Sequence, residues 1–181
     1  MYTSKWIPIA GIVVIAAAAL AACAVQPPAG KPPALGAAVS AEEVARWDIS
    51  IPPSGAGLPK GSGTARLGLQ VYEQKCLACH GAKGVGKPAD VLVGGVGSLA
   101  SKTPLRTVGS YWPYATTLFD YVRRAMPLAN PLSLSDDEVY AVSAYVLFLN
   151  GIVGEDSQMN AQTLPQVKMP NRDGFVDMSR R

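Results

Sequence analysis

Histidine and cysteine are the scarcest reactive residues of this sequence, with one histidine and three cysteines among 181 residues. A single imidazole excludes any catalytic or metal site that needs two, and it counts against zinc, which takes four cysteine or histidine ligands. Charged residues make up 16% of the chain and the net charge is +3. This small charge, without a long basic run, gives no indication of nucleic-acid binding. No pair of carboxylates is grouped in an apolar segment, so no acid–base centre is visible.

The scarce residues are concentrated in five positions, Cys76-Leu-Ala-Cys79-His80. The pattern C-x-x-C-H predicts covalent attachment of one haem c. Each thiol adds to one vinyl group of the porphyrin, and the neighbouring imidazole binds the iron. Two alternatives stay open, a zinc site and a reactive dithiol of the thioredoxin kind. The remaining cysteine, Cys23, lies far upstream and needs a separate explanation.

The second axial ligand of such a haem cannot be another histidine. Met126 is the preferred candidate, because it ends an amphipathic segment and precedes Pro127. Met169 also precedes a proline, but it lies beyond the last predicted helix. Either methionine has the alternative role of core filler, and a five-coordinate iron is the third possibility.

Several further residues are candidates for supporting roles at the haem. The carbonyl of Pro88 is expected to accept the second ring N–H of His80. Arg106 is expected to face a propionate, or else solvent. The apolar side chains expected to line the haem are Leu92, Leu99 and Trp112.

The N-terminal segment, residues 1–22, predicts a signal peptide, because Lys5 precedes an apolar run and small residues follow. L-A-A-C, ending at Cys23, resembles the lipobox of bacterial lipoproteins, in which the cysteine is acylated. The sequence therefore predicts a lipid-anchored protein on the periplasmic side of a bacterial membrane. Cleavage after Ala24 and a retained apolar helix are the alternatives.

Four segments follow the predicted signal peptide. Residues 23–45 are a tether rich in proline and glycine, and residues 46–64 are an extended arm whose apolar side chains Trp47, Ile49 and Ile51 pack on the domain. Residues 65–152 form the domain itself. The extension 153–181 is either disordered or wraps onto a catalytic subunit.

Periodicity predicts a domain that is all-α, with three to four helices around the haem. One helix runs from residue 65 to the cysteines and another covers residues 116–125. Ser135 and Glu138 have the spacing of a capping box, which starts a helix ending at Asn150. The buried stripe expected on this last helix is Val139, Val142, Tyr145, Val146 and Leu149.

Two further expectations concern helix surfaces. Gly68, on the first helix, and Tyr145, on the last, are expected to mark the point where these helices cross. Arg123 and Arg124 are expected to form an exposed helix face, with partner docking as the alternative.

Residues 64–152 resemble a class I cytochrome c, on the strength of C-L-A-C-H, R-R-A-M-P and the last helix. The longer stretch from residue 47 to 175, including T-V-G-S-Y-W-P-Y and M-P-N-R-D-G-F, resembles the cytochrome subunit of bacterial sulfane and sulfite dehydrogenases. The resemblance implies the class I cytochrome c fold, with irregular extensions at both ends. It also implies a molybdenum-cofactor subunit as electron donor, and a soluble cytochrome c or terminal oxidase as acceptor.

Many sulfane dehydrogenase cytochromes carry a second haem domain, whereas this chain has one C-x-x-C-H. Two other functions therefore stay open beside the electron-transfer subunit. One is a membrane-anchored general carrier between another dehydrogenase and a terminal oxidase. The other is a haem enzyme or gas sensor, which needs an open iron site.

Overall fold

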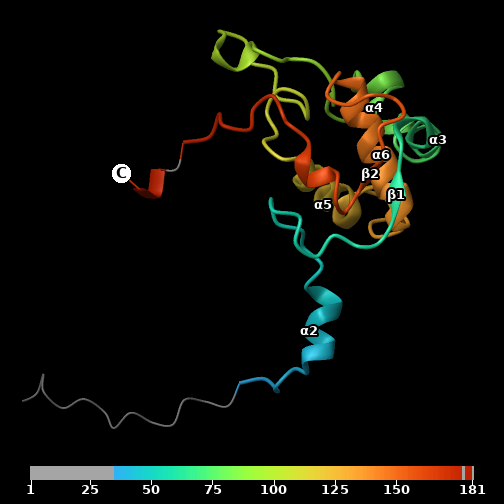
Figure 1. Ribbon diagram of the computed structural model, residues 1–181, viewed down its shortest axis with the longest axis vertical. Coiled ribbons are helices and arrows are strands. Elements are labelled where there is room, and N and C mark those ends of the chain that lie inside the picture. Colours follow the sequence, from blue (N-terminus) through green and yellow to red (C-terminus); the bar gives the residue numbers. More distant parts are fainter. Residues whose placement is uncertain (1–34, 177, 181) are drawn as a thin grey trace, which may run out of the picture. The chain divides into compact units, whose positions relative to one another are not determined.

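The computed structural model describes residues 35–176 and 178–180, so the predicted signal peptide and Cys23 lie outside the described residues. The chain forms two units, Met1–Glu43 and Val44–Arg181. Figure 1 labels the main elements. In chain order the elements are α2 (Ala41–Trp47), β1 (Ser62–Gly63), α3 (Ala65–Lys75), α4 (Leu77–His80), α5 (Ala115–Ala125), α6 (Asp136–Leu149) and β2 (Met159–Asn160), with 3-10 turns at Ala82–Gly84, Ser98–Ala100, Leu164–Gln166 and Met178–Arg180. The expected all-α architecture is confirmed, because both strands of the described part have only two residues.

Helices α3 and α6 pack side by side in the second unit (Figure 1). They approach most closely at Gly68, where any side chain would overlap the carbonyl oxygen of Ala141 and the Cβ of Tyr145. The start of α3 is capped by Thr64, whose hydroxyl accepts the N–H of Leu67. The crossing expected at Gly68 and Tyr145 is confirmed.

Helix α6 begins with the predicted capping box. The Ser135 hydroxyl accepts the backbone N–H of Glu138, and the Glu138 carboxylate accepts the N–H of Ser135 at 2.7 Å. Four residues of the expected buried stripe, Val139, Val142, Tyr145 and Val146, are buried, and Leu149 is half-buried. The stripe was predicted too narrow, because every residue from 139 to 147 is buried. Helices α3 and α5 and the strands β1 and β2 all contact α6, so most of its circumference is covered.

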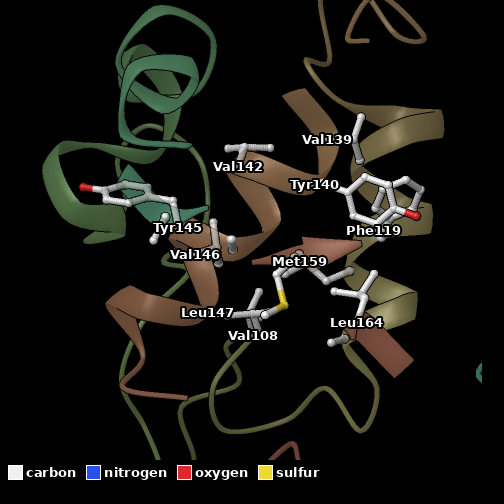
Figure 2. Packing of buried hydrophobic residues seen from close by; sticks show 14 of the residues in the cluster. Val108, Phe119, Val139, Tyr140, Val142, Tyr145, Val146, Leu147, Met159 and Leu164 are labelled. Atoms are coloured by element: carbon white, nitrogen blue, oxygen red, sulfur yellow. The ribbon is translucent and has the colours of Figure 1, made fainter. Parts of the chain in front are cut away.

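The core contains residues from α3, α5, α6 and β2, some of which Figure 2 shows. Phe119 of α5 and Tyr140 of α6 are both fully buried, with ring centroids 4.4 Å apart. Burying one aromatic side chain of this kind contributes about 2 kcal/mol or more. Figure 2 also shows Met159 and Leu164, from beyond α6, in the same cluster.

The arm, residues 46–64, is held to the domain by a buried carboxylate. Asp120 of α5 accepts the N–H of Ile51 at 2.8 Å, and the Ile51 side chain is buried. Ile49 is half-buried and its carbonyl accepts from Arg123. Trp47 was expected to pack here as well, and this is wrong, because its side chain is 81% exposed.

Both arginines at the end of α5 form ion pairs, one within the helix and one with α6. Arg124 forms an ion pair with Asp120, and its Nε lies 2.9 Å from the carboxylate. Arg123 forms an ion pair with Asp136 of α6, and its side chain is only 22% exposed. The expected exposed face is therefore wrong for Arg123, which links α5 to α6.

Helix α2 falls where the sequence predicted the tether and the start of the arm. Ser40 caps it, because the Ser40 hydroxyl accepts the N–H of Glu43. The spacing S-x-x-E is a start signal for this helix. The segment was nevertheless predicted to be a tether, because the residues around it are rich in proline.

The C-terminal extension packs against the preceding domain at least as far as Met169. β2 pairs antiparallel with β1, with Gly63 opposite Met159. Leu164 and Met169 are buried in the core. The alternative of a disordered extension is therefore wrong for this part, whose apolar residues complete the core.

Replacing Asp120 with asparagine is expected to lower the free energy of unfolding at neutral pH by about 2 kcal/mol, the cost of weakening buried hydrogen bonds to a charged group. Burial alone would raise the pKa of Asp120, but hydrogen bonds from Arg124 and Ile51, with the charges of Arg124 and Arg123, lower it from 3.8. The stabilisation is therefore complete above that ordinary value and is lost as the pH falls through the lower folded pKa.

The measurement is urea unfolding of the wild type and the D120N variant across a pH series. The difference between them should be constant near neutrality and shrink below about pH 4. Asp48→Asn, which changes an exposed carboxylate of the same arm, is the control. A difference that grows on acidification would contradict this account.

Candidate functional site

The C-x-x-C-H segment lies where α3 ends and α4 begins. Cys76 is both the C-terminal cap of α3 and the residue preceding α4. The N–H groups of Cys79 and His80 donate to the Cys76 carbonyl at 3.1 and 2.9 Å. Because residues three and four apart share one side of a helical turn, this turn places both thiols and the imidazole together.

The two thiols are not joined in a disulfide. Burial, reinforced by the nearby Cys79, raises the pKa of the Cys76 thiol to about 11. Cys76 is therefore protonated at neutral pH, whereas reactive dithiols have a lowered pKa. This environment does not favour the thioredoxin-like alternative.

The imidazole of His80 is oriented by a backbone carbonyl. Its Nδ1 lies 2.9 Å from the carbonyl oxygen of Asp90. Because a carbonyl only accepts, Nδ1 carries the proton and Nε2 is the nitrogen available as a ligand. The expected acceptor was the carbonyl of Pro88, and this prediction is wrong by two residues. The chain makes a tight turn at Pro88, in which the N–H of Lys87 donates to the carbonyl of Ala89 at 2.7 Å.

The loop after His80 folds back over the C-x-x-C-H turn. The N–H of Gly86 donates to the carbonyl of His80, and the N–H of Ala89 donates to that of Cys79. Gly81 starts the loop at φ +69°, and a side chain there would overlap the carbonyl oxygen of Gly86. From α3, the buried Tyr72 donates its hydroxyl to the carbonyl of Gly81 at 2.8 Å. The loop that carries Asp90 is thus fixed at its beginning by α3.

The end of this loop is fixed by Asn150, the residue that follows α6. Its Nδ2 donates to the carbonyls of Leu92 and Val146, and its Oδ1 accepts the N–H of Gly94. No site signal marked Asn150 in the sequence, where it appeared only as a helix stop. The loop is therefore held by α3 at one end and α6 at the other.

A second loop is joined to the first by Thr107. Its buried hydroxyl donates to the carbonyl of Gly94 at 2.6 Å and accepts the N–H groups of Gly109 and Ser110. The Ser110 hydroxyl in turn donates to the carbonyl of Leu105. These hydrogen bonds fix the segment that leads into α5.

The predicted lining residues lie on these loops. Leu92 and Trp112 pack partly against the core, and Leu99 is half-buried in a 3-10 turn. The Trp112 ring stands edge-on to Tyr121, with centroids 5.7 Å apart. Arg106 is exposed, with its guanidinium 5.7 Å from the centroid of the Tyr111 ring.

The two candidate methionines have different surroundings. Met126 caps the C-terminus of α5 in an extended conformation, and its side chain is half-buried. Met169 is 3% exposed and belongs to the core cluster with Met159. The Met169 thioether is thus already packed among apolar neighbours.

The donor set and its surroundings fit a covalently bound haem. Two unpaired thiols and a ring nitrogen lie on one turn. Helices α4 and α5, the loops between them and the segment after α5 carry large apolar side chains that are exposed. These exposed residues are Leu77, Val85, Val96, Leu105, Tyr121, Leu128 and Leu132. A flat apolar group attached at Cys76 and Cys79 requires such a surface.

The described part of the chain contains no group of three or more His, Cys, Asp or Glu side chains arranged to hold a metal ion. Within the same residues, no helix has the length and apolarity that crossing a bilayer requires.

Residues 63–146 match the family described as cytochrome c oxidase, cbb3-type, subunit III. The chain is also similar to a chain in the crystal structure of the sulfane dehydrogenase SoxCD from Paracoccus pantotrophus, at 40% identity and with a TM-score of 0.75. That match covers 81% of this chain and 73% of the other, so it extends beyond residues 63–146. No curated protein matches the chain.

Replacing Asn150 with alanine is expected to loosen the loop that orients His80. Three hydrogen bonds are lost, each contributing about 1 kcal/mol, so amide exchange between residues 84 and 94 should accelerate about tenfold or more. Hydrogen exchange measured by mass spectrometry checks this. Asn160→Ala, which removes the asparagine of a C-terminal turn, is the control. Equal exchange of the loop in both variants would contradict the role of Asn150.

Proposed function

This chain belongs to the c-type cytochromes, and from that premise we propose that it is the electron-accepting cytochrome subunit of a molybdenum-dependent dehydrogenase of sulfite or a sulfane sulfur compound. The observation that carries the proposal is the similarity to sulfane dehydrogenase SoxCD at 40% identity over most of the chain. Membership of the family implies covalent haem c, which accepts and releases one electron at its iron when bound.

Within this proposal, Cys76 and Cys79 hold the haem by thioether bonds and His80 supplies Nε2 to its iron. The Asp90 carbonyl supports the role of His80, because it fixes both the tautomer and the orientation of the ring. Asn150 and Tyr72 act through the loop that carries Asp90. Such a rigid ligand favours fast electron transfer, because little of the protein must move when the charge changes.

We assign the second axial ligand to Met126. Its position after α5 supports this, since the extended backbone at Met126 turns the chain away from the helix before Pro127. Leu99 and Trp112 would pack against the porphyrin from their loops. Arg106 at a propionate is a weaker assignment, because its guanidinium already lies over Tyr111.

A second function is favoured by the family description, which names an oxidase subunit. In that case the chain is a general carrier between another dehydrogenase and a terminal oxidase. The two functions differ in the electron donor, since only the first requires direct reduction by a sulfur-oxidising molybdenum protein.

Replacing Met126 with alanine is expected to abolish the weak sulfur-to-iron absorption band at the red edge of the spectrum and to lower the reduction potential, because thioether ligation raises it. Met169→Ala is the matched control. It should preserve the band and cost about 2–5 kcal/mol of stability, as for other buried methionines. Loss of the band in the Met169 variant alone would reverse the assignment. Carbon monoxide binding to the reduced wild type would indicate an open iron site instead.

The proposed function is tested by mixing the oxidised cytochrome with a purified molybdenum dehydrogenase from the same organism. Sulfite or thiosulfate should then reduce the haem within the turnover time of the dehydrogenase, as followed by stopped-flow absorbance. The control omits the dehydrogenase. Reduction only by other dehydrogenases, with rapid oxidation by a terminal oxidase, would favour the general carrier.

We propose further that the chain is exported and held at the periplasmic side of a membrane through an acylated Cys23, a position outside the described residues. The apolar run before residue 20 supports export, and L-A-A-C, which ends at Cys23, supports acylation. The expected result is a mature N-terminus that starts at Cys23 with the mass of its acyl chains. An unmodified start at Val25 would remove the anchor.

A further inference from the structure

Two segments far apart in the sequence build a surface cluster that shares only Arg106 with the residues assigned above to the haem. Tyr111 lies between Arg106, 5.7 Å from its ring centroid, and Phe175, whose ring is edge-on with centroids 5.2 Å apart. Asn171 donates to the carbonyl of Tyr111 at 2.7 Å, and Arg172 lies 4.3 Å from the centroid of the Tyr114 ring. We call these six residues the aromatic–arginine patch.

The patch is only partly covered by the protein itself. The side chains of Tyr111 and Phe175 are 37% and 51% exposed, and both arginines are exposed. Tyrosine, phenylalanine and arginine are the residue types enriched at protein–protein interfaces, and they carry much of the binding energy there. The edge-on contact of Tyr111 with Phe175 and the contacts of the two arginines with tyrosine rings also hold these side chains in place before binding. Less side-chain entropy is therefore lost on binding.

A recess of about 390 Å³ adjoins the patch at Arg172, lined by residues 165–169, Arg172 and Asp173. Its floor includes the buried Met169, and Lys168 and Arg172 are exposed on its lining. Such a recess suits a partner side chain that combines an apolar stem with a negative end.

The charged residues in and around the two segments that build the patch are nearly all basic. Residues 91–119 contain Lys102 and Arg106 but no acidic residue, and residues 157–172 contain Lys168 and Arg172 but none either. Asp173 is the one acidic neighbour within the recess. The surface that complements this patch is therefore acidic at its edge and apolar at its centre.

We infer that the aromatic–arginine patch docks an acidic face of the catalytic, electron-donating subunit in a lasting complex. This rests on the proposed function and adds the surface to it. We assign the patch to this lasting complex, and not to the transient contact with an electron acceptor, because its aromatic anchors are held in place before binding and lie beside a recess. Anchors of this kind carry the binding energy of tight interfaces.

The test uses the full-length holo-cytochrome and the molybdenum subunit purified without its own cytochrome. Arg172→Glu combined with Phe175→Ser should weaken binding at least tenfold, as measured by calorimetry, and wild-type binding should weaken with rising salt. Lys60→Glu combined with Leu67→Ser changes an exposed charge and an exposed apolar side chain elsewhere and is the matched control. The haem spectrum and reduction potential of both variants should equal those of the wild type, which shows that they fold.

A carbodiimide, which joins carboxylates to amines, gives an independent readout. In the complex it should link Lys168 to the molybdenum subunit, and the double variant should lose this link. If the wild type binds and is reduced but the patch variant equals the control, the docking proposal alone is wrong. If the wild type neither binds nor is reduced, the proposed function fails and the docking proposal with it. If the patch variant instead dissociates a homodimer of the cytochrome, the patch is a self-association surface and the inference is overturned.

Discussion

The close crossing of α3 and α6 at Gly68 is the constraint on which the site depends. Because Gly68 has no side chain, the backbones of the two helices meet near Ala141. That contact fixes the end of α3, where Cys76 starts the C-x-x-C-H turn, relative to the end of α6, where Asn150 follows. The loop that orients His80 spans these two ends and is hydrogen-bonded to both. A shift of either helix would therefore move the carbonyl of Asp90 away from the imidazole.

Much of this arrangement could be predicted from the sequence, because it rests on local signals. The capping box at Ser135, the helix before the cysteines and the C-x-x-C-H turn each depend on residues within a few positions. The carbonyl partner of His80 was misplaced by two residues, since the turn geometry of a glycine-rich loop depends on hydrogen bonds across it. Asn150 could not be identified, because its partners in the loop, Leu92 and Gly94, lie almost 60 residues away.

The segments outside the family match show the opposite limitation. Residues 46–64 and 153–181 have the composition of tethers and tails, which predicts little burial, although the apolar side chains of the arm, Ile51 among them, were expected to pack on the domain. They nevertheless contribute Ile51, Leu164 and Met169 to the core. Their order comes from tertiary contacts, above all Asp120 with the Ile51 N–H and the pairing of β1 with β2. Composition cannot reveal contacts of this kind, because the partner residues lie elsewhere in the chain.

The haem site and the aromatic–arginine patch are joined by a short series of hydrogen bonds. Asn150 accepts the N–H of Gly94, and Thr107 donates to the carbonyl of the same residue. Four residues after Thr107 comes Tyr111, the centre of the patch. A partner bound at Tyr111 would therefore be only a few residues along the chain from the loops that, in the proposed function, would enclose the haem. Because electron transfer weakens steeply with distance, a docking surface built on those same loops is better placed than one on the far ends of α3 or α6.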